Sequence, residues 1–169
     1  MIRYCRGKWY KNMDLLEAKL RDDENLSNCD YKYLVKMIVD VILNDNKDAS
    51  DYFGEYRWDS DKITEIDNGN YQGTLLYLIP RDTYQPSEYE YLMTYVGYGS
   101  CSGCDTLQHI QMFCDYDDEA CCTVAKPTER ALKDFMALCK DIVANMVKPY
   151  NCGWRNEADF EPVVLEETV

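Results

Sequence analysis

Apolar residues recur with a helical period in three parts of the chain. Residues 12–20 predict a short helix, and a second helix is predicted to run to Leu43 from a cap at Asn28 or Asp30. The clearest pattern starts at Thr128 and is stopped by a proline, which lacks the amide that continues a helix. The second helix is apolar enough to be expected at the centre of the core.

Between these helices the pattern changes to that of strands. Residues 62–66 alternate apolar and polar side chains, and residues 67–70 form a turn sequence. Residues 71–79 and 89–98 are longer runs with apolar side chains on both faces, so helices are expected to cover one side. We therefore predict an α+β fold, in which an antiparallel meander of three or more strands packs against N-terminal helices and one long C-terminal helix.

The length of the chain predicts one domain over residues 1–169, because 169 residues can bury a substantial core without disulfides or metal ions. Within this domain we expect a basic segment at residues 1–11 and an acidic tail at residues 156–169. The N-terminus carries charges where a signal peptide would be apolar, and no run reaches the length of a membrane helix. We therefore expect a cytoplasmic protein whose thiols are reduced.

The charge balance is strongly acidic, with 31 Asp and Glu residues against 18 Lys and Arg residues and a net charge of −13. Such a field repels nucleic acids and membrane surfaces and attracts basic proteins. A basic protein partner is expected, and direct contact with nucleic acid or membrane is not. The predicted interaction surface consists of Asp45, Asp48, Asp51, Asp59, Asp61, Asp115, Asp117, Asp118 and Glu119.

Residues 95–114 contain the densest group of chemically active side chains. The spacing of Cys101, Cys104, His109 and Cys114 is that of a CCHC zinc knuckle. Zinc prefers four thiolate and imidazole ligands arranged as a tetrahedron, and a CxxC turn presents two thiolates to one ion. Zinc is therefore the one cofactor that the sequence suggests, with these four residues as its ligands.

Two other interpretations of this stretch remain open. Asp105 is suited to cap a helix that has Leu107, Ile110 and Phe113 on one face, so the stretch can be a strand-to-helix corner with cysteines packed as small apolar groups. A CxxC motif at a helix start can also be redox-active, although the acidic neighbours disfavour a thiolate. The chain has no P-loop, GxGxxG or HExxH motif, so the sequence does not favour an enzyme.

Residues 98–105 (YGSCSGCD), the TLQ that follows them, and residues 71–79 with their YQGT start resemble small uncharacterised proteins encoded by tailed bacteriophages. The resemblance implies a phage-type protein of the host cytoplasm without established catalytic residues. We expect an acidic protein-binding module that inhibits a host defence or nucleic-acid-handling protein, with carboxylates that mimic nucleic acid in a basic groove. The alternative is a zinc-binding or thiol-dependent protein centred on the cysteines.

Overall fold

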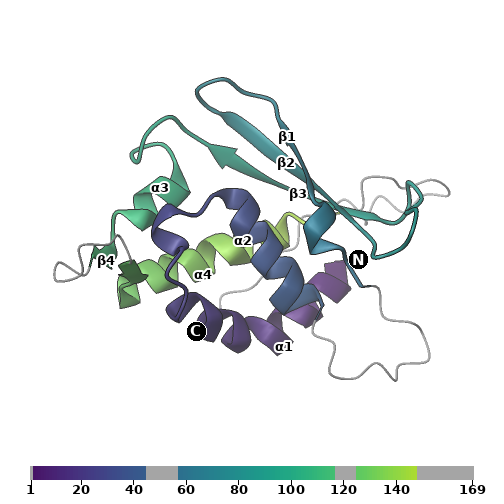
Figure 1. Cartoon of the computed structure of the whole chain (residues 1–169), viewed down its shortest axis with the longest axis horizontal. Coiled ribbons are helices and arrows are strands. Elements are labelled where there is room, and N and C mark those ends of the chain that lie inside the picture. Colours follow the sequence, from purple (N-terminus) through teal and green to yellow (C-terminus); the bar gives the residue numbers. More distant parts are fainter. Residues whose placement is uncertain (1, 45–56, 117–124, 148–169) are drawn as a thin grey trace.

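The computed structural model describes residues 2–44, 57–116 and 125–147. Its helices are α1 (Ile2–Arg21), α2 (Tyr31–Ile38), α3 (Thr106–Gln111) and α4 (Glu129–Ala144). Its strands are β1 (Thr64–Asp67), β2 (Gly73–Pro80), β3 (Tyr91–Tyr98), β4 (Cys114–Tyr116) and β5 (Ala125–Pro127). Strands β1, β2 and β3 form an antiparallel meander, with helices α2 and α4 between it and α1 (Figure 1). The predicted α+β fold with a meander and a C-terminal helix is confirmed.

Helix α1 begins at Ile2, so the predicted helix start at Asn12 is wrong, and the basic residues that follow Ile2 belong to the helix. Buried side chains recur every three or four residues from the start of the helix, which makes one continuous stripe. The buried positions are Cys5, Lys8, Trp9, Asn12, Leu16 and Leu20. Lys and Arg are good helix formers, and the basic composition therefore did not mark a boundary.

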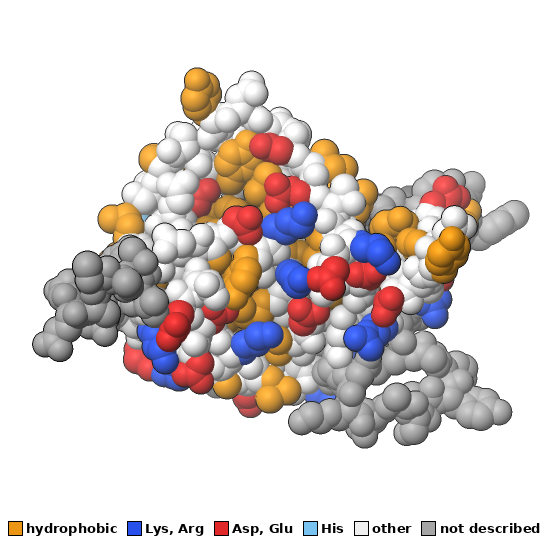
Figure 2. All heavy atoms as spheres, viewed as in Figure 1, with side chains coloured by type: hydrophobic (Ala, Val, Ile, Leu, Met, Phe, Trp, Pro, Cys, Tyr) orange, Lys and Arg blue, Asp and Glu red, His pale blue; other side chains and the backbone are white. Residues whose placement is uncertain are grey.

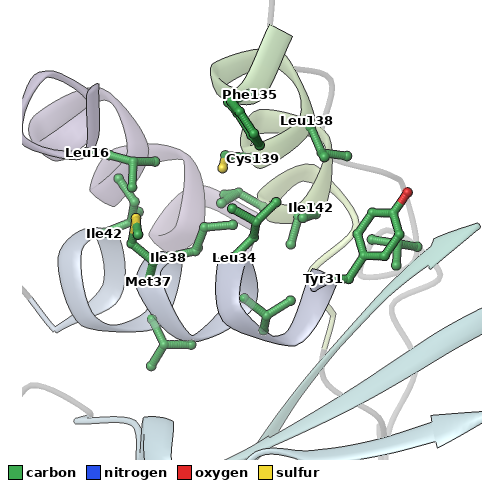
Figure 3. Close-up of a cluster of buried hydrophobic side chains, with 14 of the residues drawn as sticks. Leu16, Tyr31, Leu34, Met37, Ile38, Ile42, Phe135, Leu138, Cys139 and Ile142 are labelled. Carbon is green, nitrogen blue, oxygen red and sulfur yellow. The ribbon is translucent and has the colours of Figure 1, made fainter. Parts of the chain in front are cut away.

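Helices α1, α2 and α4 bury their apolar stripes in one shared cluster. Figure 3 shows Leu16 of α1, Leu34 of α2, and Phe135 and Ile142 of α4 pointing toward one another. Helix α2 continues into a π-helical turn (Val39–Leu43), so the predicted extent of this helix is confirmed with a change of pitch at its end. The described residues thus share a single hydrophobic core.

Side-chain caps set the start of three helices. Asp30, Asp105 and Thr128 each accept a hydrogen bond from the backbone amide three residues further along, at 2.7, 2.8 and 3.1 Å respectively. Each cap satisfies one of the amides that a helix start leaves without an intrahelical partner. The caps at Asp30, as one of two alternatives, and at Asp105 were predicted, and Thr128 was predicted as the start of its helix.

Strand β2 forms the centre of the meander. Tyr77 lies opposite Glu65 of β1 on one side and opposite Thr94 of β3 on the other. Tyr77 and Thr94 are fully buried toward the helices, whereas Ile66 and Tyr95 on the opposite face are 44% and 46% exposed. Within the described residues, helices therefore cover one face of the sheet, as predicted.

The end of α4 is attached to strand β3. The Thr94 hydroxyl donates to the Ile142 carbonyl at 2.7 Å. Ile142 lies in the last turn of α4, where backbone carbonyls have no amide donor within the helix. Past the helix, the backbones of Met93 and Val147 exchange two hydrogen bonds of 2.8 Å. The C-terminal helix and the sheet are therefore joined by polar contacts as well as by the core.

Strands β4 and β5 form a small pair that the sequence pattern did not reveal. Cys114 lies opposite Pro127 and Asp115 opposite Lys126. Asp115, a member of the predicted interaction surface, therefore lies inside a strand. Residues 117–119 and the expected tail at residues 156–169 lie outside the described ranges.

Candidate functional site

The cysteine turn (residues 99–105) joins β3 to α3 and is visible at the left of Figure 1. The Cys101 carbonyl accepts hydrogen bonds from the amides of Cys104, at 2.9 Å, and Asp105, at 2.8 Å. These two bonds fold the chain back on itself immediately before the helix. The interpretation of this stretch as a strand-to-helix corner is therefore confirmed, but the expectation that its cysteines pack as small apolar groups is wrong for Cys101 and Cys104, which are exposed.

Asp105 anchors the cysteine turn to the core. Its carboxylate is 4% exposed and accepts hydrogen bonds from the Gly99 amide (3.1 Å), the Gln108 amide (2.8 Å) and the Tyr31 hydroxyl (3.2 Å). The Tyr31 hydroxyl itself accepts from the Leu107 amide at 3.1 Å. Because a buried charge is costly unless it is hydrogen-bonded, this network fixes the turn against α2 and α3.

Gly99 is required by a close approach of two backbone segments. A β-carbon at this position would lie 2.4 Å from the carbonyl oxygen of Cys104 and 2.5 Å from its Sγ atom. At Gly103 the nearest atom to an added β-carbon is Cys101 Sγ, at an ordinary contact distance of 3.8 Å. A side chain at position 99 would therefore clash with Cys104, whereas one at position 103 has room.

The structure brings together two of the four predicted zinc ligands. Cys101 and Cys104 are both exposed on the turn, whereas Cys114 is buried in β4. His109 is exposed on α3 and packs edge-on against Phe113, with ring centroids 5.3 Å apart. Among the described residues, no group of three or more His, Cys, Asp or Glu side chains is arranged to hold a metal ion. Zinc binding therefore stays a prediction.

Cys101 and Cys104 form a close dithiol. Their Sγ atoms lie 3.0 Å apart, and the Cys101 amide donates to Cys104 Sγ at 3.3 Å. The hydrogen bond from the Cys101 thiol, assisted by backbone amides, lowers the pKa of the Cys104 thiol from its ordinary value. Burial has the opposite effect elsewhere, raising the pKa of Cys5 to about 11 and that of Cys29 to about 12. Among the described cysteines, Cys104 is therefore the one best suited to react as a thiolate.

A pocket of about 360 Å³ lies beside the cysteine turn, between the start of α2 and the meander. Its lining includes the carboxylates of Asp30, Glu65, Asp67 and Asp105, and no Lys, Arg or His. In Figure 2 acidic side chains lie on the upper, sheet-side part of the face, whereas acidic and basic side chains are interspersed lower down. The charged groups that line the pocket are thus all negative.

The four carboxylates differ in how many hydrogen bonds they already accept. Asp105 is fully engaged, as described above, and Asp67 Oδ1 accepts from the Gly69 amide (2.9 Å) and the Tyr98 hydroxyl (2.8 Å). Asp30 uses Oδ1 for its helix cap. No hydrogen bond or ion pair of the Glu65 carboxylate is found within the described ranges. Glu65 and the second oxygens of Asp30 and Asp67 are therefore the acceptors open to a ligand.

A buried hydroxyl lies close to the carboxylates of Glu65 and Asp30. Tyr77 is fully buried, and its hydroxyl has no hydrogen-bond partner in the part of the chain that the structure describes. Burial raises the pKa of Tyr77 above its ordinary value, and the Glu65 side chain adds to this, first by its hydrogen-bonding approach to the hydroxyl and then by its charge, followed by the charge of Asp30. A buried hydroxyl without a partner costs about 1–3 kcal/mol.

Two glycines lie beside the contact between Asp67 and Tyr98, which both line the pocket. A β-carbon on Gly69 would lie 2.8 Å from the Tyr98 hydroxyl, and one on Gly73 would lie 2.7 Å from the α-carbon of Gly69. Their small size lets the Tyr98 hydroxyl reach Asp67 across the β1–β2 turn. Sequence reasoning identified this turn and the cap at Asp30, but it had no signal that placed them beside Glu65.

Only three members of the predicted acidic surface lie within the described residues. Asp59 pairs with Lys62 at 2.7 Å, an interaction that lowers the Asp59 pKa, and Asp61 pairs with Lys36. Both carboxylates are therefore offset by lysines of the same chain. Asp115 lies in β4. The other predicted members lie outside the described residues: Asp45, Asp48, Asp51, Asp117, Asp118 and Glu119.

Within the described ranges, none of the helices has the length and apolar composition needed to cross a membrane. Comparison with known proteins identifies no relative of the chain. No protein-family model matches the chain, and no curated protein or solved structure matches it either.

Proposed function

We propose that the chain is an acidic protein-binding module whose pocket takes a lysine or arginine side chain of a basic partner protein. One observation carries this proposal: the pocket joins four carboxylates without any Lys, Arg or His. A cation that donates hydrogen bonds complements this lining in both charge and hydrogen bonding.

The pocket also suits the shape of a basic side chain. Leu75 and Leu107 line it together with the carboxylates, so an aliphatic stem can lie on apolar surface while its charged end reaches Glu65. A guanidinium group can donate two parallel hydrogen bonds to one carboxylate, and such bonds are about twice as strong as neutral ones. Arginine is therefore the preferred occupant and lysine the second choice.

The whole chain supports the same class of partner. A net charge of −13 steers basic proteins toward the molecule and repels nucleic acids. The resemblance of residues 98–105 to phage proteins supports a cytoplasmic host protein as the partner, in particular a defence or nucleic-acid-handling factor with a basic groove. In such a complex the pocket carboxylates occupy positions that phosphates would take.

The pocket can be tested with two charge-neutralising substitutions. Glu65→Gln removes the open carboxylate, and Asp30→Asn removes a charge while keeping a good helix cap, because Asn caps as well as Asp. Asp14→Asn, at an exposed position of α1 that does not line the pocket, is the matched control. N-acetyl-arginine methylamide and the corresponding lysine and glutamate derivatives serve as probes in titrations followed by NMR.

We expect the arginine probe to shift amide resonances around the pocket in the parent protein and in Asp14→Asn, but not in the Glu65→Gln/Asp30→Asn double variant. The glutamate probe should produce no shifts. Added salt should weaken binding, because the attraction is between partly exposed charges. Equal shifts with the arginine and glutamate probes, or binding unchanged by salt or by the double substitution, would contradict the proposal.

A further inference from the structure

We infer that Cys101 and Cys104 form a reversible thiol–disulfide redox pair. The inference is independent of what the acidic pocket binds. It follows from three features of the turn: the contact between the two sulfur atoms, their exposure compared with the other described cysteines, and the rigid attachment of the turn on either side of them.

The sulfur atoms are close enough to bond with little movement. Cys101 Sγ and Cys104 Sγ lie 3.0 Å apart while both cysteines are free. A disulfide bond is about 2 Å long, so closing it requires the atoms to approach by about 1 Å. The two hydrogen bonds accepted by the Cys101 carbonyl already hold both residues in the same tight turn.

Among the described cysteines, Cys101 and Cys104 alone are exposed. Cys5 and Cys139 have no exposed surface, and Cys114 is 5% exposed. Cys29 is partly buried, and its thiol donates to the Leu26 carbonyl at 3.4 Å. A dissolved disulfide can therefore reach this pair without local unfolding, whereas at Cys5, Cys114 and Cys139 it would first have to open the core.

The fold around the pair can stay in place when the pair reacts. Asp105 holds the two ends of the turn together through its hydrogen bond from the Gly99 amide, and Tyr31 ties it to α2. These contacts are made on the buried side of the turn, whereas the sulfur atoms face the solvent. Oxidation and reduction should therefore leave the core unchanged.

The reaction follows ordinary thiol–disulfide exchange with glutathione disulfide as the oxidant. The Cys104 thiolate attacks one sulfur of glutathione disulfide, which forms a mixed disulfide and releases one glutathione thiolate. Cys101, on losing its proton, then attacks Cys104 Sγ, which forms the Cys101–Cys104 bond and releases the second glutathione. Two protein thiols are oxidised, one glutathione disulfide is reduced to two glutathione thiols, and the reverse reaction restores the dithiol.

The test uses the full chain with Cys121, Cys122 and Cys152, which lie outside the described residues, replaced by serine. This background protein is equilibrated near neutral pH in buffers of reduced and oxidised glutathione, quenched with acid, alkylated and analysed by mass spectrometry. We expect a product lighter by two hydrogen atoms, with a Cys101–Cys104 linkage in the peptide map, that returns to the dithiol in excess reduced glutathione. Cys5 and Cys139 should remain reduced throughout.

Alkylation rates give a second readout that does not require disulfide formation. The pKa of Cys5 is raised from 9.0 to about 11, which lowers its thiolate fraction about a hundredfold. Cys104 should therefore be alkylated at least about a hundredfold faster than Cys5 in the folded protein. Equal rates at the two cysteines would contradict the inference, provided that far-UV circular dichroism shows a folded chain.

The two glycines of the turn provide a matched pair of variants. Gly99→Ala places a methyl group 2.5 Å from Cys104 Sγ and should move this thiol and slow formation of the linkage, whereas Gly103→Ala should behave as the parent. Accumulation of a mixed disulfide at Cys104 without a Cys101–Cys104 linkage would overturn the inference. So would stoichiometric zinc in protein purified without chelator and lost in Cys104→Ser, since the pair would then be part of a metal site.

Discussion

Replacing Asp105 with alanine should cost far more stability than removing an ordinary helix cap. The substitution deletes the cap of α3, worth about 1 kcal/mol, and leaves the Gly99 amide and the Tyr31 hydroxyl without their acceptor. Each buried group left unpaired costs about 1–3 kcal/mol. We expect Asp105→Ala to lower the free energy of unfolding by about 3–7 kcal/mol.

Urea denaturation followed by far-UV circular dichroism measures this loss, with a constant m-value showing that the same transition is compared. Asp30→Ala is the matched control, because Asp30 is an exposed cap with one backbone hydrogen bond, and it should cost about 1 kcal/mol. If Asp105→Ala proves too unstable to purify, Asp105→Asn keeps one acceptor and should lie between the two. Equal costs for Asp105→Ala and Asp30→Ala would refute the assignment of Asp105 as the anchor.

Three further predictions follow from individual contacts. Gly7→Ala should stabilise the protein by about 0.5–1 kcal/mol in urea denaturation, because Gly7 lies in α1 with open space around it. Thr94→Val should destabilise it by about 2 kcal/mol in the same assay, by leaving the Ile142 carbonyl without its donor. Burial raises the pKa of Tyr31 from 10.0 to about 12 and that of Cys5 from 9.0 to about 11, so the unfolded chain loses these protons first. Stability should therefore fall as the pH rises from 9 to 12, a trend that urea midpoints measured across this range would check.

The local parts of the fold could be predicted from sequence because their causes are local. The caps at Asp30, Asp105 and Thr128 depend on one side chain and an amide three residues away. The strands of the meander follow from apolar runs separated by turn residues. The start of α1 was not predicted, because the basic residues near the N-terminus suggested a separate segment. The helical spacing of the buried side chains nevertheless continues through Trp9 and Cys5.

The pocket could not be predicted, because it is assembled from distant parts of the chain. Asp30 caps α2, Glu65 lies on a short edge strand, and Asp105 caps α3. Each carboxylate has a sufficient local explanation in the sequence, and only the packing of the meander on the helices brings the three together. The zinc-knuckle spacing predicted a cluster of four ligands that the structure does not assemble. Spacing along the chain did not place His109 and Cys114 beside Cys101 and Cys104.

The pocket and the dithiol share the cysteine turn, yet their chemistry is separable. Gly99 and Asp105 line the pocket and also hold the turn, whereas the reacting sulfur atoms are not among the residues that line the pocket. Replacing Cys101 and Cys104 by serine should therefore leave binding of the arginine probe unchanged, and Glu65→Gln should leave the redox equilibrium unchanged. NMR titration and the glutathione assay on both variants test this. If the serine variant lost binding while remaining folded, the two sites would be coupled, and the hydrogen bond from Gly99 to Asp105 is the connection through which oxidation of the turn would act on the pocket.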